Sequence, residues 1–314
     1  MTYKIAIPGQ TRELDIVDPN STAVQRALRR GGLAAYEPPT MTTLLTLFEQ
    51  EAGSLTFFDI GANMGLYAAI CAAGFRPRAI HAFEPTPTTA AAARAVVKAN
   101  DLNVEVVEAA LGDTNGVAEL HLSDQSDSSN SLVVGFKKSS DSVTVTVRRI
   151  DDYVAETKVT PTVIKIDVET HEPAVLAGAV DTIAASRPFI VVEVLNRRGH
   201  DHGTEITAVM KPFGYSYYRL GSTPDWEAQP VITGALGTTN SDWLLAPAPL
   251  AADFVTRWAR WSAELAECGS EKNSRVPVMR SVRAAFRRGG ISEVFAAARR
   301  FVAAIRRERA RENS

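Results

Sequence analysis

Short apolar runs alternate with segments of helical length along this sequence, and that alternation constrains the fold more than any other feature. Mostly apolar runs occur at 55–60, 79–83, 163–166 and 189–192. Strands of a parallel sheet have this composition because helices cover both faces of the sheet. Segments such as 88–100 supply those helices. The pattern therefore predicts a doubly wound α/β domain.

Additional strands complete the predicted sheet. We expect one further strand of this sheet at 104–108. Residues 116–149 are predicted as an insertion with two strands, one on either side of a Ser/Asp-rich loop at 123–131. Strand-like segments at 215–220 and 242–245 can supply the antiparallel edge that large mixed sheets carry. The prediction is thus a seven-stranded, mostly parallel sheet with an antiparallel edge.

Three regions are predicted along the chain. Residues 1–52 form an N-terminal lead-in with helices, 53–248 the ligand-binding domain, and 249–314 a basic helical C-terminal extension. Met1–Gln10 has the composition of neither a signal nor a transit peptide. No segment has the roughly 18 to 20 consecutive apolar residues of a membrane span. We therefore expect a cytoplasmic protein.

The first predicted strand ends in an acidic residue followed by a glycine-bearing turn that opens a helix, from Asp59 to Leu66. Small residues at such a turn let the backbone approach a ligand, and the exposed amides of the next helix can bind its polar end. The residue two positions after Gly61 is Asn63, so the turn lacks the G-x-G-x-x-G spacing of dinucleotide enzymes. This disfavours a nicotinamide cofactor.

The next two strand ends indicate an adenosine-containing ligand. The strand at 79–83 leads into Glu84, and a carboxylate there can accept both ribose hydroxyls. The following strand leads into small residues that include Ala110, which leave room for a flat base. Asp113 is placed to receive the exocyclic amine of that base.

Several ordered motifs resemble one known family, the FkbM-type methyltransferases, over roughly residues 33–220. The motifs are Tyr36-Glu37-Pro38, Asp59 to Gly65, Phe83-Glu84-Pro85, Arg149 to Asp152, Ile164 to Glu169, Arg187-Pro188 and Val192-Glu193. The resemblance implies a class I methyltransferase fold with S-adenosylmethionine as the methyl donor. It also implies, in most members, O-methylation of a sugar or natural-product hydroxyl.

The resemblance carries site roles onto matching positions. Asp59, Gly61, Asn63 and Gly65 would line the methionine part of the donor, Glu84 the ribose, and Ala110 the edge of the adenine. The same motifs add further residues to the predicted cofactor site: Glu37, Ala62, Leu66, Phe83, Pro85 and Asp167. The sequence departs from the family pattern at Thr170-His171, where a small pair is common.

Methyl transfer needs alignment of the acceptor with the methyl group and removal of the acceptor proton. Asp167, Glu169 and His171 cluster at the end of one predicted strand, and Glu193 ends the next. Histidine titrates near neutrality, so His171 is predicted as the base, with the three carboxylates as further catalytic candidates. Mg²⁺ bound by Asp167 and Glu193 remains open, because spacing alone does not decide it.

The C-terminal extension differs from the rest of the chain in charge. Residues 271–314 hold 12 Arg or Lys and 4 Glu, a local charge of +8 that leaves −10 elsewhere. Apolar residues between 291 and 305 fall on one helical face. The extension is expected either to dock on the acidic body or a second copy, or to bind an anionic membrane surface. Nucleic acid is disfavoured, because aromatic residues are not interleaved with the basic ones.

The sequence thus predicts an S-adenosylmethionine-dependent methyltransferase that acts on a sugar hydroxyl of a glycan, glycolipid or natural product. One alternative is an N- or C-methyltransferase of a peptide or natural product. Another is a non-catalytic module that binds an adenosine ligand.

Overall fold

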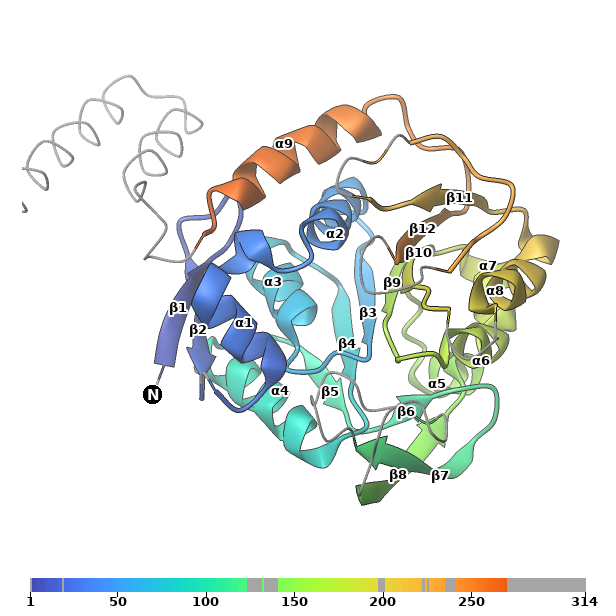
Figure 1. Ribbon diagram of the computed structural model, residues 1–314, viewed down its shortest axis with the longest axis horizontal. Coiled ribbons are helices and arrows are strands. Elements are labelled where there is room, and N and C mark those ends of the chain that lie inside the picture. Colours follow the sequence, from blue (N-terminus) through green and yellow to red (C-terminus); the bar gives the residue numbers. More distant parts are fainter. Residues whose placement is uncertain are drawn as a thin grey trace, which may run out of the picture.

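The computed structural model describes residues 2–18, 20–122, 132, 141–196, 201–221, 224, 226–234 and 241–269. A seven-stranded sheet lies at its centre, in the order β11-β12-β10-β9-β3-β4-β5 (Figure 1). The strands are β3 (Thr56–Ile60), β4 (Ala79–Phe83), β5 (Glu105–Val107), β9 (Val163–Ile166), β10 (Phe189–Glu193), β11 (Ser216–Arg219) and β12 (Asp242–Ala246). β12, between β10 and β11, runs antiparallel to the other strands of this sheet. The predicted mostly parallel sheet is confirmed, with its antiparallel strand one place in from the edge.

Helices cover both faces of this sheet. They are α2 (Pro38–Gln50), α3 (Leu66–Gly74), α4 (Pro87–Ala99) and α9 (Phe254–Ala266) on one face, and α5 (Ile150–Thr157), α6 (Glu172–Ala177), α7 (Val180–Ser186) and α8 (His202–Met210) on the other. The adjacent residues Phe57 and Phe58 belong to different hydrophobic clusters. Successive strand residues point to opposite faces, so the continuous apolar runs feed two cores.

The N-terminal residues extend the first of these cores. An antiparallel hairpin of β1 (Thr2–Ala6) and β2 (Glu13–Val17) leads to α1 (Ala23–Gly31) and the 3-10 turn η1 (Leu33–Ala35). Thr22 and Gln25 form a capping box at the start of α1, which satisfies amides that the helix leaves unpaired. Leu14 and Leu28 join the cluster that contains Phe57.

Helix α9 packs on α2, although more than 200 residues separate their contacting side chains. Trp258 donates a hydrogen bond to Thr43 Oγ1 at 3.0 Å, and Trp261 donates one to Glu49 Oε2 at 2.9 Å. Described residues before position 52 and after position 248 therefore belong to the same hydrophobic cluster as residues between these positions. The three-region division stays a prediction.

A small second sheet lies beyond the carboxyl end of the central one. It contains β6 (Ala110–Leu111), β8 (Asp141–Arg148) and β7 (Gly116–Leu122), in that order. The two strands expected between 116 and 149 are thus confirmed, while the loop at 123–131 lies outside the described residues. A 3-10 turn, η3 (Lys211–Phe213), follows α8.

The strand order places a crevice between β3 and β9. The chain adds β4 and β5 on one side of β3, then crosses over and adds β9 and β10 on the other side. In open α/β sheets, ligands bind at such a switch point, outside the carboxyl ends of the strands. No helix of the described part of the chain is long and apolar enough to span a membrane.

Candidate functional site

A pocket of about 850 Å³, including its part open to solvent, occupies this switch point. The predicted site residues that line it are Gly61, Ala62, Asn63, Leu66, Phe83, Glu84, Pro85, Ala110, Asp167, Glu169 and His171. The predicted residues outside its lining are Glu37, Asp59, Gly65 and Glu193.

The turn after β3 brings three strand ends together. Gly61 has φ +75°, and a Cβ atom there would lie 1.8 Å from the carbonyl oxygen of Asp167. The amides of Gly61 and Ala62 both donate to the carbonyl oxygen of Phe83 at 3.0 Å. Only glycine accommodates both this backbone conformation and this close approach. The turn therefore ties the ends of β3, β4 and β9 into one wall.

Glu84 is held in a fixed orientation at the end of β4. Its Oε2 accepts a hydrogen bond from the amide of Asn63 at 3.0 Å, and its Oε1 accepts one from the amide of Thr86 at 2.9 Å. Each carboxylate oxygen has two lone pairs and can accept more than one hydrogen bond. This geometry fits the predicted ribose role.

Asp59 lies beneath the turn. It is fully buried, and its Oδ2 accepts a hydrogen bond from the amide of Ala68 in the first turn of α3 at 3.1 Å. Burial raises the pKa of Asp59 to about 6, while nearby Lys165 lowers it. In this structure Asp59 anchors α3 to β3 and positions the turn from below.

The sequence indicates Lys165 as one alternative partner of Asp167 but not as a residue of the pocket, which it lines from the middle of β9. It is 4% exposed, and its Nζ lies 3.1 Å from Asp167 Oδ2 and 4.8 Å from the centre of the Tyr67 ring. Burial lowers the pKa of Lys165, but Asp167, Asp59 and Glu37 raise it by more. A lysine within an otherwise apolar parallel strand was the available signal, since buried lysines are rare unless paired.

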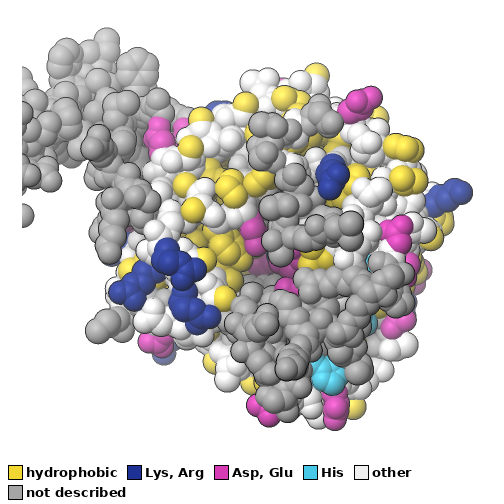
Figure 2. All heavy atoms as spheres, viewed as in Figure 1, with side chains coloured by type: hydrophobic (Ala, Val, Ile, Leu, Met, Phe, Trp, Pro, Cys, Tyr) yellow, Lys and Arg dark blue, Asp and Glu magenta, His cyan; other side chains and the backbone are white. Residues whose placement is uncertain are grey.

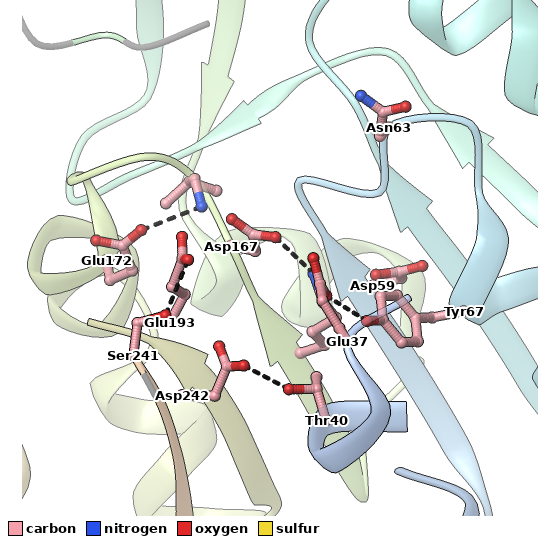
Figure 3. A network of polar contacts seen from close by, with 12 residues as sticks. Glu37, Thr40, Asp59, Asn63, Tyr67, Asp167, Glu172, Glu193, Ser241 and Asp242 are labelled. Carbon is pink, nitrogen blue, oxygen red and sulfur yellow. Dashed lines mark hydrogen bonds and ion pairs between the residues drawn. The ribbon is translucent and has the colours of Figure 1, made fainter. Parts of the chain in front are cut away.

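Glu37 belongs to the same group of charges and lies beside Tyr67 (Figure 3). The Tyr67 hydroxyl donates a hydrogen bond to Glu37 Oε2. Burial raises the pKa of Glu37, and Lys165 opposes that rise. Glu37 also has a left-handed backbone conformation, φ +42°, immediately before α2.

Three further carboxyl groups lie beyond Asp167, towards β10 and β12 (Figure 3). Glu193 accepts a hydrogen bond from Ser241 Oγ at 3.2 Å, and its pKa is raised by burial, Asp167 and Asp242. Burial raises the pKa of Glu172 to about 8 and that of Asp242 to about 7. Figure 2 shows acidic side chains at the bottom of a hollow on this face. We call Asp167, Glu169, Glu172, Glu193 and Asp242 the acidic chamber.

His171 lies on the other side of the pocket. A Cβ atom on Gly112 would be 3.2 Å from its Nε2. Burial lowers the pKa of His171, and Asp113 opposes this shift. The preceding residues Glu169 and Thr170 have φ values of +53° and +80°, a strained conformation for side chains other than glycine.

Glu172 stabilises that strained turn. Its Oε1 accepts hydrogen bonds from the amides of Val168 at 3.1 Å and Thr170 at 3.2 Å. The turn directs His171 towards Gly112, next to the predicted adenine position at Ala110. His171 and Asp167 thus have different neighbours in the pocket.

No group of three or more His, Cys, Asp or Glu side chains within the described ranges is arranged to hold a metal ion. Asp167, one of the two predicted Mg²⁺ ligands, pairs with Lys165. The expectation of Mg²⁺ has no support in this part of the chain.

The family model described as the methyltransferase FkbM domain matches residues 59–217, slightly more than half of the chain. The chain belongs to the FkbM methyltransferase family. It is therefore an S-adenosylmethionine-dependent methyltransferase. No curated protein sequence matches it.

Solved structures of several methyltransferases are similar to this FkbM-family chain. Methyltransferase FkbM from Methylobacillus flagellatus KT has 17% identity and a TM-score of 0.39, over 61% of this chain and 43% of that one. The S-adenosylmethionine-dependent methyltransferase from Agrobacterium tumefaciens has 8% identity and a TM-score of 0.45, over 79% and 70%. The O-methyltransferase from Bacillus cereus, in complex with S-adenosylhomocysteine, has 15% identity and a TM-score of 0.37, over 66% and 80%.

The residues of the pocket fit S-adenosylmethionine. Gly61 and Asn63 line the pocket at the turn after β3, and Glu84 presents a fixed carboxylate at the end of β4. Ala110 is small and lines the pocket beyond β5, where a flat base needs room. The individual roles of these residues stay predictions.

Proposed function

We propose that this FkbM-family enzyme transfers the methyl group of S-adenosylmethionine to a hydroxyl group of a sugar, on a glycan, a glycolipid or a natural product. The observation that carries this proposal is the Lys165–Asp167 ion pair, because both residues line the donor pocket and Asp167 also belongs to the acidic chamber. Carboxyl groups suit a sugar acceptor, because they accept hydrogen bonds when ionised and can also donate one when protonated.

The donor would be held along the pocket wall. Glu84 would accept hydrogen bonds from the ribose hydroxyls, Ala110 would contact the adenine edge, and His171 would pack against the base. Gly61 and Asn63 would let the backbone approach the methionine part. When bound, S-adenosylmethionine supplies an activated methyl group on a positively charged sulfur.

Asp167 would take the proton from the acceptor hydroxyl. Lys165 contacts its Oδ2 and thereby fixes the orientation of the carboxylate. The sequence predicts His171 as the base, but the position of His171 beside Gly112 favours Asp167 for this step. Alignment by the acidic chamber and proton removal by Asp167 would together provide catalysis.

N-methylation of an amine is the second candidate. The acidic chamber supports it, because its carboxyl groups would attract a cationic amine as well as hydrogen-bond to a sugar. A panel of matched sugars and amino sugars separates the two, with the methylated product located by mass spectrometry. A hydroxyl product supports the proposal, and an amine product supports the second candidate.

Calorimetric titration with S-adenosylmethionine and S-adenosylhomocysteine tests whether the chain binds the proposed donor, with NAD as the control. We expect saturable binding of the first two, weakened about 10- to 100-fold in Glu84→Ala by the loss of hydrogen bonds to a charged group. No binding to the wild-type chain would contradict the proposal. Binding without turnover on any acceptor would favour the non-catalytic module.

Asp167→Asn tests whether Asp167 takes the proton from the acceptor hydroxyl. The amide keeps the shape of the carboxylate but cannot take the proton. We expect kcat to fall about 100- to 10,000-fold, the usual contribution of a general base, while affinity for S-adenosylhomocysteine changes little. Unchanged kcat at saturating acceptor would exclude Asp167 as the base.

A further inference from the structure

Three arginines form a basic face on α1, beside the mouth of the pocket. Arg26, Arg29 and Arg30 are spaced by three and four residues, which places them on one side of a helix. The opposite side packs into the body through Val24 and Leu28, and Val24 also lines the pocket. Figure 2 shows Lys and Arg side chains gathered over α1, next to the hollow.

The C-terminal extension leaves the body at the same place. Gly269 pairs with Gly32, directly after α1, and the amide of Ala34 donates to the carbonyl oxygen of Cys268 at 3.1 Å. The next 44 residues, 271–314, carry the local charge of +8. The last turn of α1, with Arg29 and Arg30, therefore lies where this basic segment begins.

Charge is thus distributed unequally over the molecule. The rest of the chain has a net charge of −10. Beside an anionic surface, the basic side of the molecule would be attracted and the acidic remainder repelled. Such a surface would fix the orientation of the molecule as well as bind it.

We propose that the basic face of α1, acting with the basic C-terminal extension, docks this enzyme on an anionic phospholipid membrane. The pocket mouth then lies beside the membrane. Attachment is peripheral, through charge and the amphipathic pattern at 291–305. If the proposed function holds, an acceptor attached to lipid is delivered directly to the pocket.

A membrane fits this surface better than a soluble phosphate compound. Each Lys or Arg near an anionic bilayer contributes about 1 kcal/mol of attraction, so a broad basic surface gains energy from many residues at once. A single phosphate can contact only a few of them.

The test is co-sedimentation of the full chain with vesicles at low salt. Vesicles of phosphatidylcholine mixed with phosphatidylglycerol are compared with vesicles of phosphatidylcholine alone. We expect binding only to the anionic vesicles, with loss of binding at high salt. In Arg29→Gln/Arg30→Gln the affinity should fall about 10- to 30-fold, from about 1 kcal/mol per residue.

The matched control is Arg76→Gln/Arg78→Gln, which removes the same charge from two exposed arginines just before β4, at the opposite end of the sheet. It should bind vesicles nearly as the wild type does. Failure of the wild-type chain to bind anionic vesicles would overturn the proposal, as would equal weakening in both double variants. Titration with S-adenosylhomocysteine on the same samples reports donor binding separately, so failure of the proposed function is recognised independently.

Discussion

At the residue scale, His171 and Asp167 follow the same strand but contact different surroundings. Asp167 pairs with Lys165, whereas His171 lies beside Gly112 and is influenced by Asp113. Burial lowers the pKa of His171, which favours a neutral imidazole at physiological pH. A neutral ring against the predicted adenine position is suited to packing on the base.

His171→Ala should therefore weaken binding of S-adenosylhomocysteine, by about tenfold if the ring stacks on adenine. kcat at saturating donor and acceptor should fall only a few-fold. His171→Phe keeps a flat ring and should restore most of the affinity. Calorimetry and steady-state kinetics distinguish the roles, since a histidine base would lose kcat in both variants without losing affinity.

Glu172 offers a second prediction at this scale, through pH. Its pKa in the folded protein, about 8, lies above the ordinary value for glutamate, so the folded state binds this proton more tightly than the unfolded state. The contribution is favourable at low pH and is lost as pH rises through about 8. Glu172→Gln cannot ionise and should keep its stability over that interval.

Urea unfolding at about pH 5 and pH 8 measures this difference. Between these two pH values, the wild type should lose up to a few kcal/mol of unfolding free energy that Glu172→Gln keeps. Glu119→Gln, at an exposed position of β7, controls for the loss of one carboxylate. Parallel pH curves for wild type and Glu172→Gln would contradict the assignment.

At the element scale, the geometry of the site depends on the turn between β3 and α3. In Gly61→Ala, the new methyl group would collide with the carbonyl oxygen of Asp167, and the positive φ would add about 1 to 2 kcal/mol of strain. We expect loss of donor binding and a destabilisation of at least about 3 kcal/mol.

Gly53→Ala is the matched control, because nothing lies within 4 Å of a Cβ atom at that position. Its unfolding curve and donor affinity should match those of the wild type. Thermal unfolding and calorimetry on both variants check the pair. If the two variants were equally stable and bound the donor equally well, the close approach of Gly61 to Asp167 would not determine the conformation of the turn.

The order of elements could be predicted from the sequence, but their neighbours in space could not. The apolar runs predicted the parallel strands, because strands that are buried on both faces consist mostly of apolar residues. Nothing local shows that β12 inserts between β10 and β11, since that pairing joins segments distant in the chain. The contact of α9 with α2 depends on Trp258 and Trp261 meeting residues more than 200 positions away.

The functional site could likewise be predicted only in part. Strand-end motifs predicted the pocket lining at Gly61, Glu84 and Ala110, because parallel strands bring their carboxyl ends to one edge. They did not show that Asp59 points beneath the turn, or that Lys165 lines the pocket. Side-chain direction depends on packing around the strand end, which spacing along the chain does not encode.

At the scale of the whole molecule, the extent of the folded body decides where the chain can be shortened. Phe254, Trp261 and Leu265 of α9 are buried in the cluster that includes α2 and β3. Cys268 is buried, and Gly269 pairs with Gly32. These contacts make residues up to 269 part of the body that holds the pocket.

Two truncations test this boundary. A chain ending at residue 269 should unfold at nearly the same temperature as the full chain and bind S-adenosylhomocysteine equally well, but lose most of its affinity for anionic vesicles. A chain ending at residue 251 should lose roughly 5 to 8 kcal/mol of stability, from about 1.5 to 3 kcal/mol for each of three buried side chains. It should also expose the face of α2 that Trp258 and Trp261 cover. If both truncations were equally stable, the predicted boundary at 248 would be the true end of the folded body, and α9 would belong with the basic extension.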